Sequence, residues 1–180
     1  ALETISRNLW WSWTQSARDL FECIDPELWN AVERNPIALI DKLPLARINE
    51  LEQDKQFLLR LDAVDAQLKE YMSEKPDEKT PEIAYFSMEY GLHSSLKIYS
   101  GGLGILAGDY LKEASDKNTP MVAVGLLYRY GYFTQRLSAQ GAQEATYEAQ
   151  NFFKLPISPV RDEFGNWITT QVAFPGRTLT

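Results

Sequence analysis

Three glycines, Gly101, Gly102 and Gly104, run directly into a predicted helix in the stretch IYSGGLGILAGDYLKEAS. Glycine inside a helix costs roughly 1 kcal/mol relative to alanine, so a helix that begins on glycines needs a physical reason for them. The helix has no acidic side chain in its first two turns, since Asp109 is the first one. The positive end of the helix dipole therefore has no neutralising carboxylate in the local sequence.

Two explanations of these glycines are open at this point. Exposed backbone N–H groups at a helix N-terminus form an anion site, most naturally for phosphate. Alternatively, the missing side chains let the helix pack closely on a neighbouring strand. A P-loop is excluded because the sequence contains no Gly-Lys-Ser or Gly-Lys-Thr.

A dinucleotide site is disfavoured, although Gly102-x-Gly104-x-x-Ala107 formally matches the fingerprint. That fingerprint directly follows its strand, and an acidic residue for the ribose stands at the end of the next strand. Here residues 89 to 100 separate the predicted strand from the glycines, and the first acid after the second strand is Glu144. The spacing therefore argues against an NAD site.

The elements around the glycines predict a parallel sheet. EIAYFSM (82 to 88) and PMVAVGLLY (120 to 128) are apolar, β-prone runs, and the helix between them spans about 101 to 117. Strand, helix and strand in this order indicate a parallel βαβ unit with a right-handed crossover. Two further β-prone runs around 162 to 166 predict a hairpin. The last residues, GRTLT, read as part of a β segment, so we expect a fragment of a longer protein.

The first 72 residues have a different character. Asp25-Pro26 and Asn35-Pro36 each place a capping side chain before a proline suited to the first helical position. We expect four or five short packed helices. Residues 73 to 81, SEKPDEKTP, are charged and carry two prolines, which is typical of a linker. The predicted organisation is a helical segment (1–72), a linker (73–81) and an incomplete α/β lobe (82–180).

Several residues in the helical segment have either a structural or a functional interpretation. The tryptophans could stack on sugar rings, but their helical spacing favours a core position. Trp10, Trp13 and Ala17 fit one helical face, and Trp11 falls on another. Cys23 is expected to be a small buried side chain.

Composition and charge exclude several function classes. The chain is 44% hydrophobic and 24% charged, which is typical of a globular protein. A net charge of −7 without a basic patch argues against a nucleic-acid surface. No apolar run approaches the ~20 residues of a membrane span, and the start lacks a secretion signal, so we expect a cytoplasmic protein. One cysteine and one histidine permit neither a disulfide nor a zinc cluster.

At this point the residues resemble a known family. AYFSMEYGLHSSLKIYSGGLGILAGDYLKEASD, followed by VGLLYRYGYFTQRL, is similar to the α-glucan phosphorylases of the bacterial type. NLWWSW and DPELWNAVERNP are similar to the helical segment that precedes the catalytic domains in that type. The resemblance implies an α/β fold in which a helical segment is followed by the start of a Rossmann-like, glycosyltransferase B type lobe with a β-hairpin extension.

The resemblance also implies phosphorolysis of α-1,4-glucan to glucose 1-phosphate, with pyridoxal phosphate as the cofactor. Family members are several times longer than this chain, and their cofactor lysine belongs to a later lobe. We therefore expect no catalytic residue in this fragment, no bound cofactor and no activity of the fragment alone. The expected partners of the parent protein are α-1,4-glucan and phosphate. A homodimer is compatible with the family.

Site residues follow from the resemblance position by position. The residues that match the family's glycine-rich loop, which lies over the cofactor and substrate phosphates, are Gly101, Gly102, Leu103 and Gly104. Glu89 and Tyr90 match the strand-end segment beside that loop. His93 is a candidate to hydrogen-bond a sugar hydroxyl or a phosphate, although a lone loop histidine is more often structural.

At two places this chain differs from related enzyme families, and these differences bear on the alternative functions. Bacterial starch and glycogen synthases carry a lysine two residues before their paired glycines, where this chain has Tyr99, with Lys97 further back. Animal-type phosphorylases carry an arginine and a glutamate at the positions of Leu127 and Arg129, so nucleotide control of the animal kind is not implied. The remaining alternatives are a sugar-nucleotide glycosyltransferase of the glycogen synthase kind and a non-catalytic helical interaction or carbohydrate-binding module.

Overall fold

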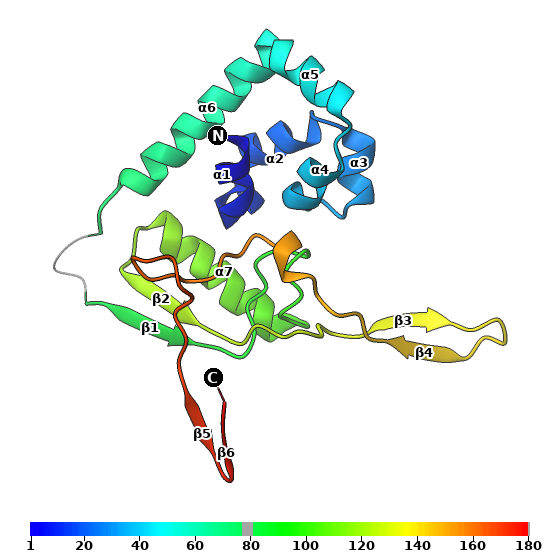
Figure 1. The fold of residues 1–180 in the computed structure, drawn as a ribbon, viewed down its shortest axis with the longest axis vertical. Helices are drawn as coiled ribbons and strands as arrows, with labels where there is room; N and C mark the ends of the chain where they lie inside the picture. Colours follow the sequence, from blue (N-terminus) through cyan, green and yellow to red (C-terminus); the bar gives the residue numbers. More distant parts are fainter. Residues whose placement is uncertain (77–80, 180) are drawn as a thin grey trace.

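The computed structural model describes residues 1–76 and 81–179 and shows a mixed helix and sheet fold (Figure 1). The helices before the first strand are α1 (Leu2–Arg7), η1 (Leu9–Ser12), α2 (Gln15–Glu22), α3 (Pro26–Ala31), α4 (Pro36–Lys42), α5 (Leu45–Gln53) and α6 (Lys55–Ser73). The elements that follow are β1 (Ile83–Phe86), α7 (Gly102–Asp116), β2 (Met121–Val124), β3 (Thr134–Leu137), β4 (Gln143–Thr146), η2 (Phe152–Lys154), β5 (Val172–Phe174) and β6 (Arg177–Leu179).

Capping side chains start the helices where the sequence predicts them. The Asp25 carboxylate accepts a hydrogen bond from the Leu28 N–H at 2.9 Å, at the start of α3. The Asn35 side chain accepts from the N–H groups of Ile37 and Ala38 at the start of α4. The predicted number of four or five helices is too low, since six α-helices and one 3-10 helix precede β1 in the described residues. The central part of the predicted 73–81 linker, residues 77–80, lies outside the described residues.

The core of the helical segment is built on aromatic side chains. Trp11 is fully buried and packs edge-on against Phe21 and Trp29, with ring centroids 5.9 and 6.1 Å apart. Trp10 packs on Tyr71 of α6 on the other side. The core assignment of the tryptophans in the helical segment is confirmed, and Trp11, predicted on a different helical face from Trp10 and Trp13, is buried as well. The short 3-10 helix η1 is packed on two sides, so neighbouring residues are both buried.

Cys23 is a free thiol and is half-buried, less deeply than predicted. Its Sγ donates to the Leu20 carbonyl at 3.1 Å, across one turn of α2.

The predicted βαβ unit is confirmed. β1 and β2 pair in parallel with Ile83 opposite Met121 and Phe86 opposite Val124, and α7 lies between them in the chain. Each strand has four residues, so the pairing is shorter than the apolar runs that predicted it. Tyr85 of β1 packs edge-on against Tyr110 of α7, with ring centroids 5.6 Å apart, which places the helix on the sheet.

Two antiparallel hairpins, β3–β4 and β5–β6, project from the rest of the chain (Figure 1). The hairpin predicted around 162 to 166 is present only as a tight turn with a single bridge between Arg161 and Trp167. The Asp162 carboxylate accepts from the N–H groups of Phe164 and Asn166 and holds this turn. The β character predicted for the last residues is confirmed by β6.

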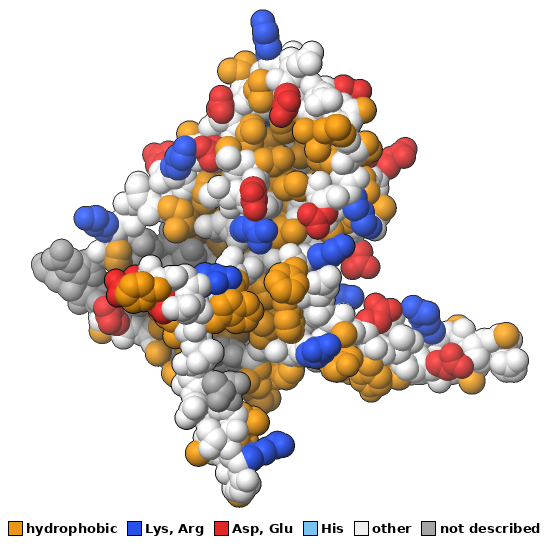
Figure 2. All heavy atoms as spheres, viewed as in Figure 1, with side chains coloured by type: hydrophobic (Ala, Val, Ile, Leu, Met, Phe, Trp, Pro, Cys, Tyr) orange, Lys and Arg blue, Asp and Glu red, His pale blue; other side chains and the backbone are white. Residues whose placement is uncertain are grey.

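The surface of the α/β part is unusually apolar. The accessible surface of the chain is 12,703 Å², whereas a compact monomer of this mass exposes about 8,900 Å². Phe86 of β1, Leu106 of α7 and Val122 of β2 are 72%, 70% and 64% exposed. Figure 2 shows hydrophobic side chains at the surface in the middle of the molecule. None of the described helices has the length and apolar character needed to cross a membrane.

Candidate functional site: the glycine-rich turn before α7

The helix α7 begins on a backbone conformation that requires glycine. Gly101 is its N-cap, with φ +106° and ψ −160°, a region that residues with a Cβ rarely adopt. Among the described residues, no side chain caps this helix, and its first turn contains no acid. The N–H groups of Gly102, Leu103 and Gly104 precede the first intrahelical bond, which joins the Ile105 N–H to the Gly101 carbonyl at 3.1 Å. These three donors point beyond the end of the helix.

The other glycines of this stretch differ in what surrounds them. A Cβ on Gly104 would lie 2.5 Å from the Tyr99 Cβ, and a Cβ on Gly108 would lie 2.1 Å from the carbonyl oxygen of Gly91. Both positions are therefore closed by close packing. A Cβ on Gly102 would meet no heavy atom of the described residues within 4 Å. Close packing therefore explains Gly104 and Gly108, although their neighbours are Tyr99 and Gly91 and not a strand, whereas Gly102 opens outward and stays a candidate for the predicted anion site.

The segment between β1 and the glycines is fixed against the first turn of α7. The Gly91 N–H donates to the Gly104 carbonyl at 2.7 Å. Oε2 of Glu89 accepts a hydrogen bond from the Ser100 N–H at 3.0 Å, immediately before the glycine-rich turn. Glu89 is therefore beside the glycines, as the resemblance implies, and in this structure it holds the backbone that leads into the turn.

Tyr90 is buried where β1 and β2 end. Its hydroxyl lies 2.6 Å from the Tyr85 carbonyl and 3.3 Å from the Val124 carbonyl, so it ties the ends of the two strands together. Burial raises the pKa of the Tyr90 phenol. Its ring also lies where a Cβ on Gly125 would stand, at 2.9 Å. Ligands of parallel α/β sheets bind at the carboxyl ends of the strands, and Tyr90 shapes the backbone at that end.

His93 faces the helical segment. Its ring packs edge-on against Trp11, with centroids 4.6 Å apart, and its Nδ1 lies 2.9 Å from the Ser95 hydroxyl. Burial lowers the pKa of His93 to about 4, with smaller contributions from the nearby cations Lys112 and Arg34. The imidazole is therefore neutral at pH 7. These contacts favour the structural reading of His93.

A hollow of about 190 Å³ lies beside the turn. Its lining residues are Glu89, Lys97, Ile98, Tyr99, Ser100, Tyr128, Tyr130, Gly131 and Tyr132. Sequence reasoning missed this cluster, although the alternating tyrosines of YRYGY (128 to 132) are a usable signal for an extended segment with one aromatic face.

Sequence reasoning also missed Gln150, whose side-chain amide joins two of the lining residues, Lys97 and Tyr128. Its Oε1 accepts from the Lys97 N–H at 3.1 Å, and its Nε2 donates to the Lys97 carbonyl at 3.2 Å. The same amide nitrogen donates to the Tyr128 carbonyl. No local pattern marks such a residue, because its partners are distant in the sequence.

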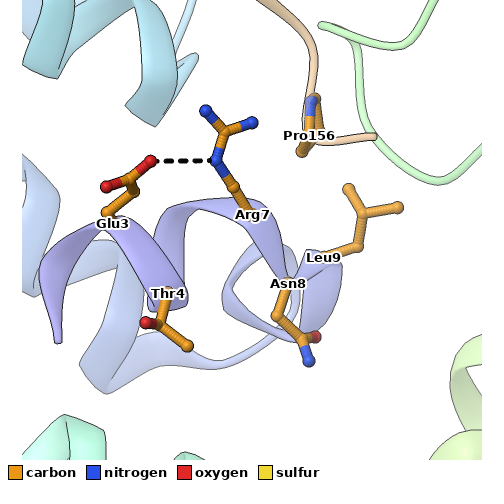
Figure 3. Close-up of a pocket in the computed structure, with 6 residues that line it drawn as sticks. All are labelled: Glu3, Thr4, Arg7, Asn8, Leu9 and Pro156. Carbon is orange, nitrogen blue, oxygen red and sulfur yellow. Dashed lines mark hydrogen bonds and ion pairs between the residues drawn. The ribbon is translucent and has the colours of Figure 1, made fainter. Parts of the chain in front are cut away.

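A larger hollow of about 560 Å³ lies on the helical segment (Figure 3). It is lined by Glu3, Thr4, Arg7, Asn8, Leu9 and Pro156, none of which belongs to the glycine-rich turn. Arg7 is paired with Glu3 at 3.3 Å, so the guanidinium charge is already partly neutralised. This arrangement is a poor anion site, and the glycine-rich turn remains the better candidate.

Comparison with known proteins agrees with the sequence resemblance. A family model described as "Protein of unknown function (DUF3417)" matches residues 1–96, which include the helical segment, β1 and the loop that carries Glu89, Tyr90 and His93. The chain belongs to the DUF3417 family. The matched region ends just before the glycine-rich turn. No solved structure matches the chain.

Several curated relatives of this DUF3417 chain are named phosphorylases. The chain is 44% identical over 185 residues to a glycogen phosphorylase of Mycobacterium tuberculosis, covering 96% of this chain and 21% of that protein. It is 40% identical over 183 residues to a maltodextrin phosphorylase of Thermococcus litoralis, covering 97% and 22%. It is 42% identical over 172 residues to a glycogen phosphorylase of Aquifex aeolicus, covering 93% and 24%. The predicted resemblance to the α-glucan phosphorylases is confirmed, and the chain spans less than a quarter of these relatives.

Proposed function

We propose that this chain forms the N-terminal part of an α-glucan phosphorylase, which uses phosphate to release glucose 1-phosphate from α-1,4-glucan. The observation that carries the proposal is the start of α7. The first turn of this helix contains no acidic residue, and a Cβ on Gly102 would meet no heavy atom of the described residues within 4 Å. Backbone N–H groups in that arrangement stabilise a phosphate group. The phosphorylase names of the relatives support this choice of anion.

The residues at the turn fit the phosphate of pyridoxal phosphate as well as the substrate phosphate. The N–H groups of Gly102, Leu103 and Gly104 would face such a group, while Glu89 holds the preceding backbone in place. When bound, the cofactor supplies a phosphate that performs acid–base work beside the substrate phosphate. The covalent lysine and the basic residues that clamp substrate phosphate are proposed to come from the remainder of the parent protein.

We also propose that β1, α7 and β2 are the beginning of a Rossmann-like lobe of the glycosyltransferase B type. A two-stranded parallel sheet is too small to bury its own faces, and parallel sheets are normally covered on both sides. The exposed Phe86 and Val122 side chains support further strands and helices packing here in the parent protein.

The test uses the full-length protein with maltodextrin and inorganic phosphate. We expect release of glucose 1-phosphate, absolute dependence on phosphate, and the absorption band of a bound pyridoxal group. Glucan extension from a sugar nucleotide without phosphate would instead select the glycogen synthase alternative. Glucan binding without turnover in either assay would select the non-catalytic module. The 180-residue chain alone is expected to be inactive and to bind no cofactor.

A further inference from the structure

The helical segment forms hydrogen bonds with the C-terminal end of α7. Nε1 of Trp13 donates to Oδ1 of Asp116 at 3.0 Å. The Tyr71 hydroxyl, from the end of α6, lies 2.8 Å from the same carboxylate oxygen and 2.7 Å from the Ser115 hydroxyl. The pKa of Tyr71 is raised to about 12, first by burial and also by the hydrogen bond to Asp116. Two residues that are far apart in the helical segment therefore converge on one carboxylate.

Asp116 stands at an electrostatically unfavourable position of its own helix. It is the last residue of α7, where the carbonyl end of the helix dipole repels a negative charge. The last turn of α7 contains no basic residue to offset this repulsion. Trp13 and Tyr71 supply the donors that make a carboxylate favourable there. The position of Asp116 is thus explained by the contact between segments and not by the helix alone.

The helical segment also reaches the other end of α7, through the loop that follows β1. Trp11 packs against His93 in that loop. The same loop donates the Gly91 N–H to the carbonyl of Gly104, within the first turn of α7. Its later part leads directly into Gly101. Both ends of α7 are therefore held, directly or through one loop, by a segment whose family description gives no function.

We propose that the helical segment, residues 1–72, positions α7 and with it the Gly101–Gly102 turn. Trp13, Tyr71 and Asp116 are the positioning residues of this contact, which we name the Asp116 clamp. The kinetic consequence of the clamp rests on the proposed function, because it concerns phosphate at the N-terminus of α7. The structural consequence does not, because it concerns only the order of α7.

The first experiment removes the two donors while keeping an aromatic ring at each position. The double variant Trp13→Phe, Tyr71→Phe is examined by amide hydrogen exchange in the full-length protein. Loss of two hydrogen bonds to a carboxylate corresponds to at least about tenfold faster exchange in α7. We expect the increase to include the amides of residues 105 to 108, near the glycine turn. Ser16→Ala is the matched control, since it removes the Ser16–Gln67 hydrogen bond within the helical segment without touching α7.

The second experiment separates the clamp from the helix dipole. Asp116→Asn keeps an acceptor for Trp13 and Tyr71 but loses the charge that strengthens both hydrogen bonds, so exchange in α7 is expected to rise less than with Asp116→Ala. Asp116→Ala removes the acceptor and is expected to match the double variant. If Asp116 acted only as a charge at the end of α7, alanine would slow exchange there, because an unfavourable charge would be gone. Slower exchange, or faster exchange confined to the last turn, would overturn the proposal.

The kinetic readout is made on the same variants of the full-length protein. For the double variant we expect the KM for phosphate to rise about threefold to tenfold. We expect the KM for glucan to stay within about twofold, because only the phosphate-facing turn moves. Equal changes in the KM for phosphate and the KM for glucan, or no change in either, would refute the proposal that the clamp positions the turn. A parent protein that makes no glucose 1-phosphate would refute the proposed function instead, and the exchange experiment would still decide whether the clamp orders α7.

Discussion

Two alanine substitutions on α7 test whether its glycines have the separate roles that the structure assigns. Gly102→Ala adds a methyl group in open space, at a helical position with ordinary φ. Replacing such a glycine stabilises a protein by about 0.4–1 kcal/mol, mainly because the unfolded chain loses freedom. Gly108→Ala places its methyl group 2.1 Å from the Gly91 carbonyl oxygen, which is backbone and cannot rotate away.

The expected cost of Gly108→Ala follows from three contributions. Overpacking costs up to about 3 kcal/mol. Displacing the loop also breaks the hydrogen bond from the Gly91 N–H to the Gly104 carbonyl, which is worth about 1 kcal/mol. The better helix propensity of alanine returns about 1 kcal/mol. The net loss is up to about 3 kcal/mol, so the two variants should differ by up to about 4 kcal/mol in the free energy of unfolding.

The first assay is thermal unfolding of the unsubstituted 180-residue chain and of its two variants. A difference of about 4 kcal/mol corresponds to roughly 8–16 °C in Tm for a chain of this size. Gly102→Ala should melt at or slightly above the Tm of the unsubstituted chain, and Gly108→Ala well below it. A Gly108→Ala variant that melts with the parent would refute the close packing of α7 on the loop.

The second assay concerns phosphate in the full-length protein. The methyl group of Gly102→Ala would leave the N–H in place but would keep a phosphate oxygen away from it, and losing such a contact in a catalytic site typically costs ~3 kcal/mol, or on the order of 100-fold in rate. Gly102→Ala should therefore lower kcat/KM for phosphate strongly while the protein remains fully folded. Phosphate kinetics within about twofold of the parent would show that Gly102 does not face the phosphate.

Two further predictions concern stability. Since the folded pKa of His93 is about 4, below its usual 6.5, the unfolded chain alone takes up this proton as pH falls from about 6.5 to 4, and stability should decrease across that window. Urea unfolding at several pH values should show that the free energy of unfolding of His93→Gln depends less on pH in that window. An unchanged pH dependence would contradict the burial of the imidazole. Asn35→Ala removes the cap of α4 and the hydrogen bond from Asn35 Nδ2 to the Lys154 carbonyl. It should lower the free energy of unfolding, measured by urea titration, by about 2 kcal/mol. The control is Asn30→Ala, which loses only one exposed hydrogen bond within α3. Its free energy of unfolding should stay within about 0.5 kcal/mol of the unsubstituted chain.

The sequence alone determined those features that depend on a residue and its near neighbours. Asp25 and Asn35 start their helices because an acceptor side chain before a proline satisfies N–H groups within the next turn. The order of apolar runs predicted the parallel pairing of β1 and β2. The hairpin β3–β4 escaped prediction because its strands, TQRL and QEAT, are fully exposed or nearly so and carry no apolar alternation.

Only the tertiary structure decided which glycine does what. Gly102, Gly104 and Gly108 look equivalent in the sequence, and they differ because open space, Tyr99 and Gly91 respectively stand opposite them. The role of His93 likewise depended on a partner, Trp11, that lies in the helical segment. The physical reason is that propensity and capping act along the chain over a few residues. Steric approach, in contrast, depends on which distant backbone is folded against a position, and no local pattern encodes that neighbour.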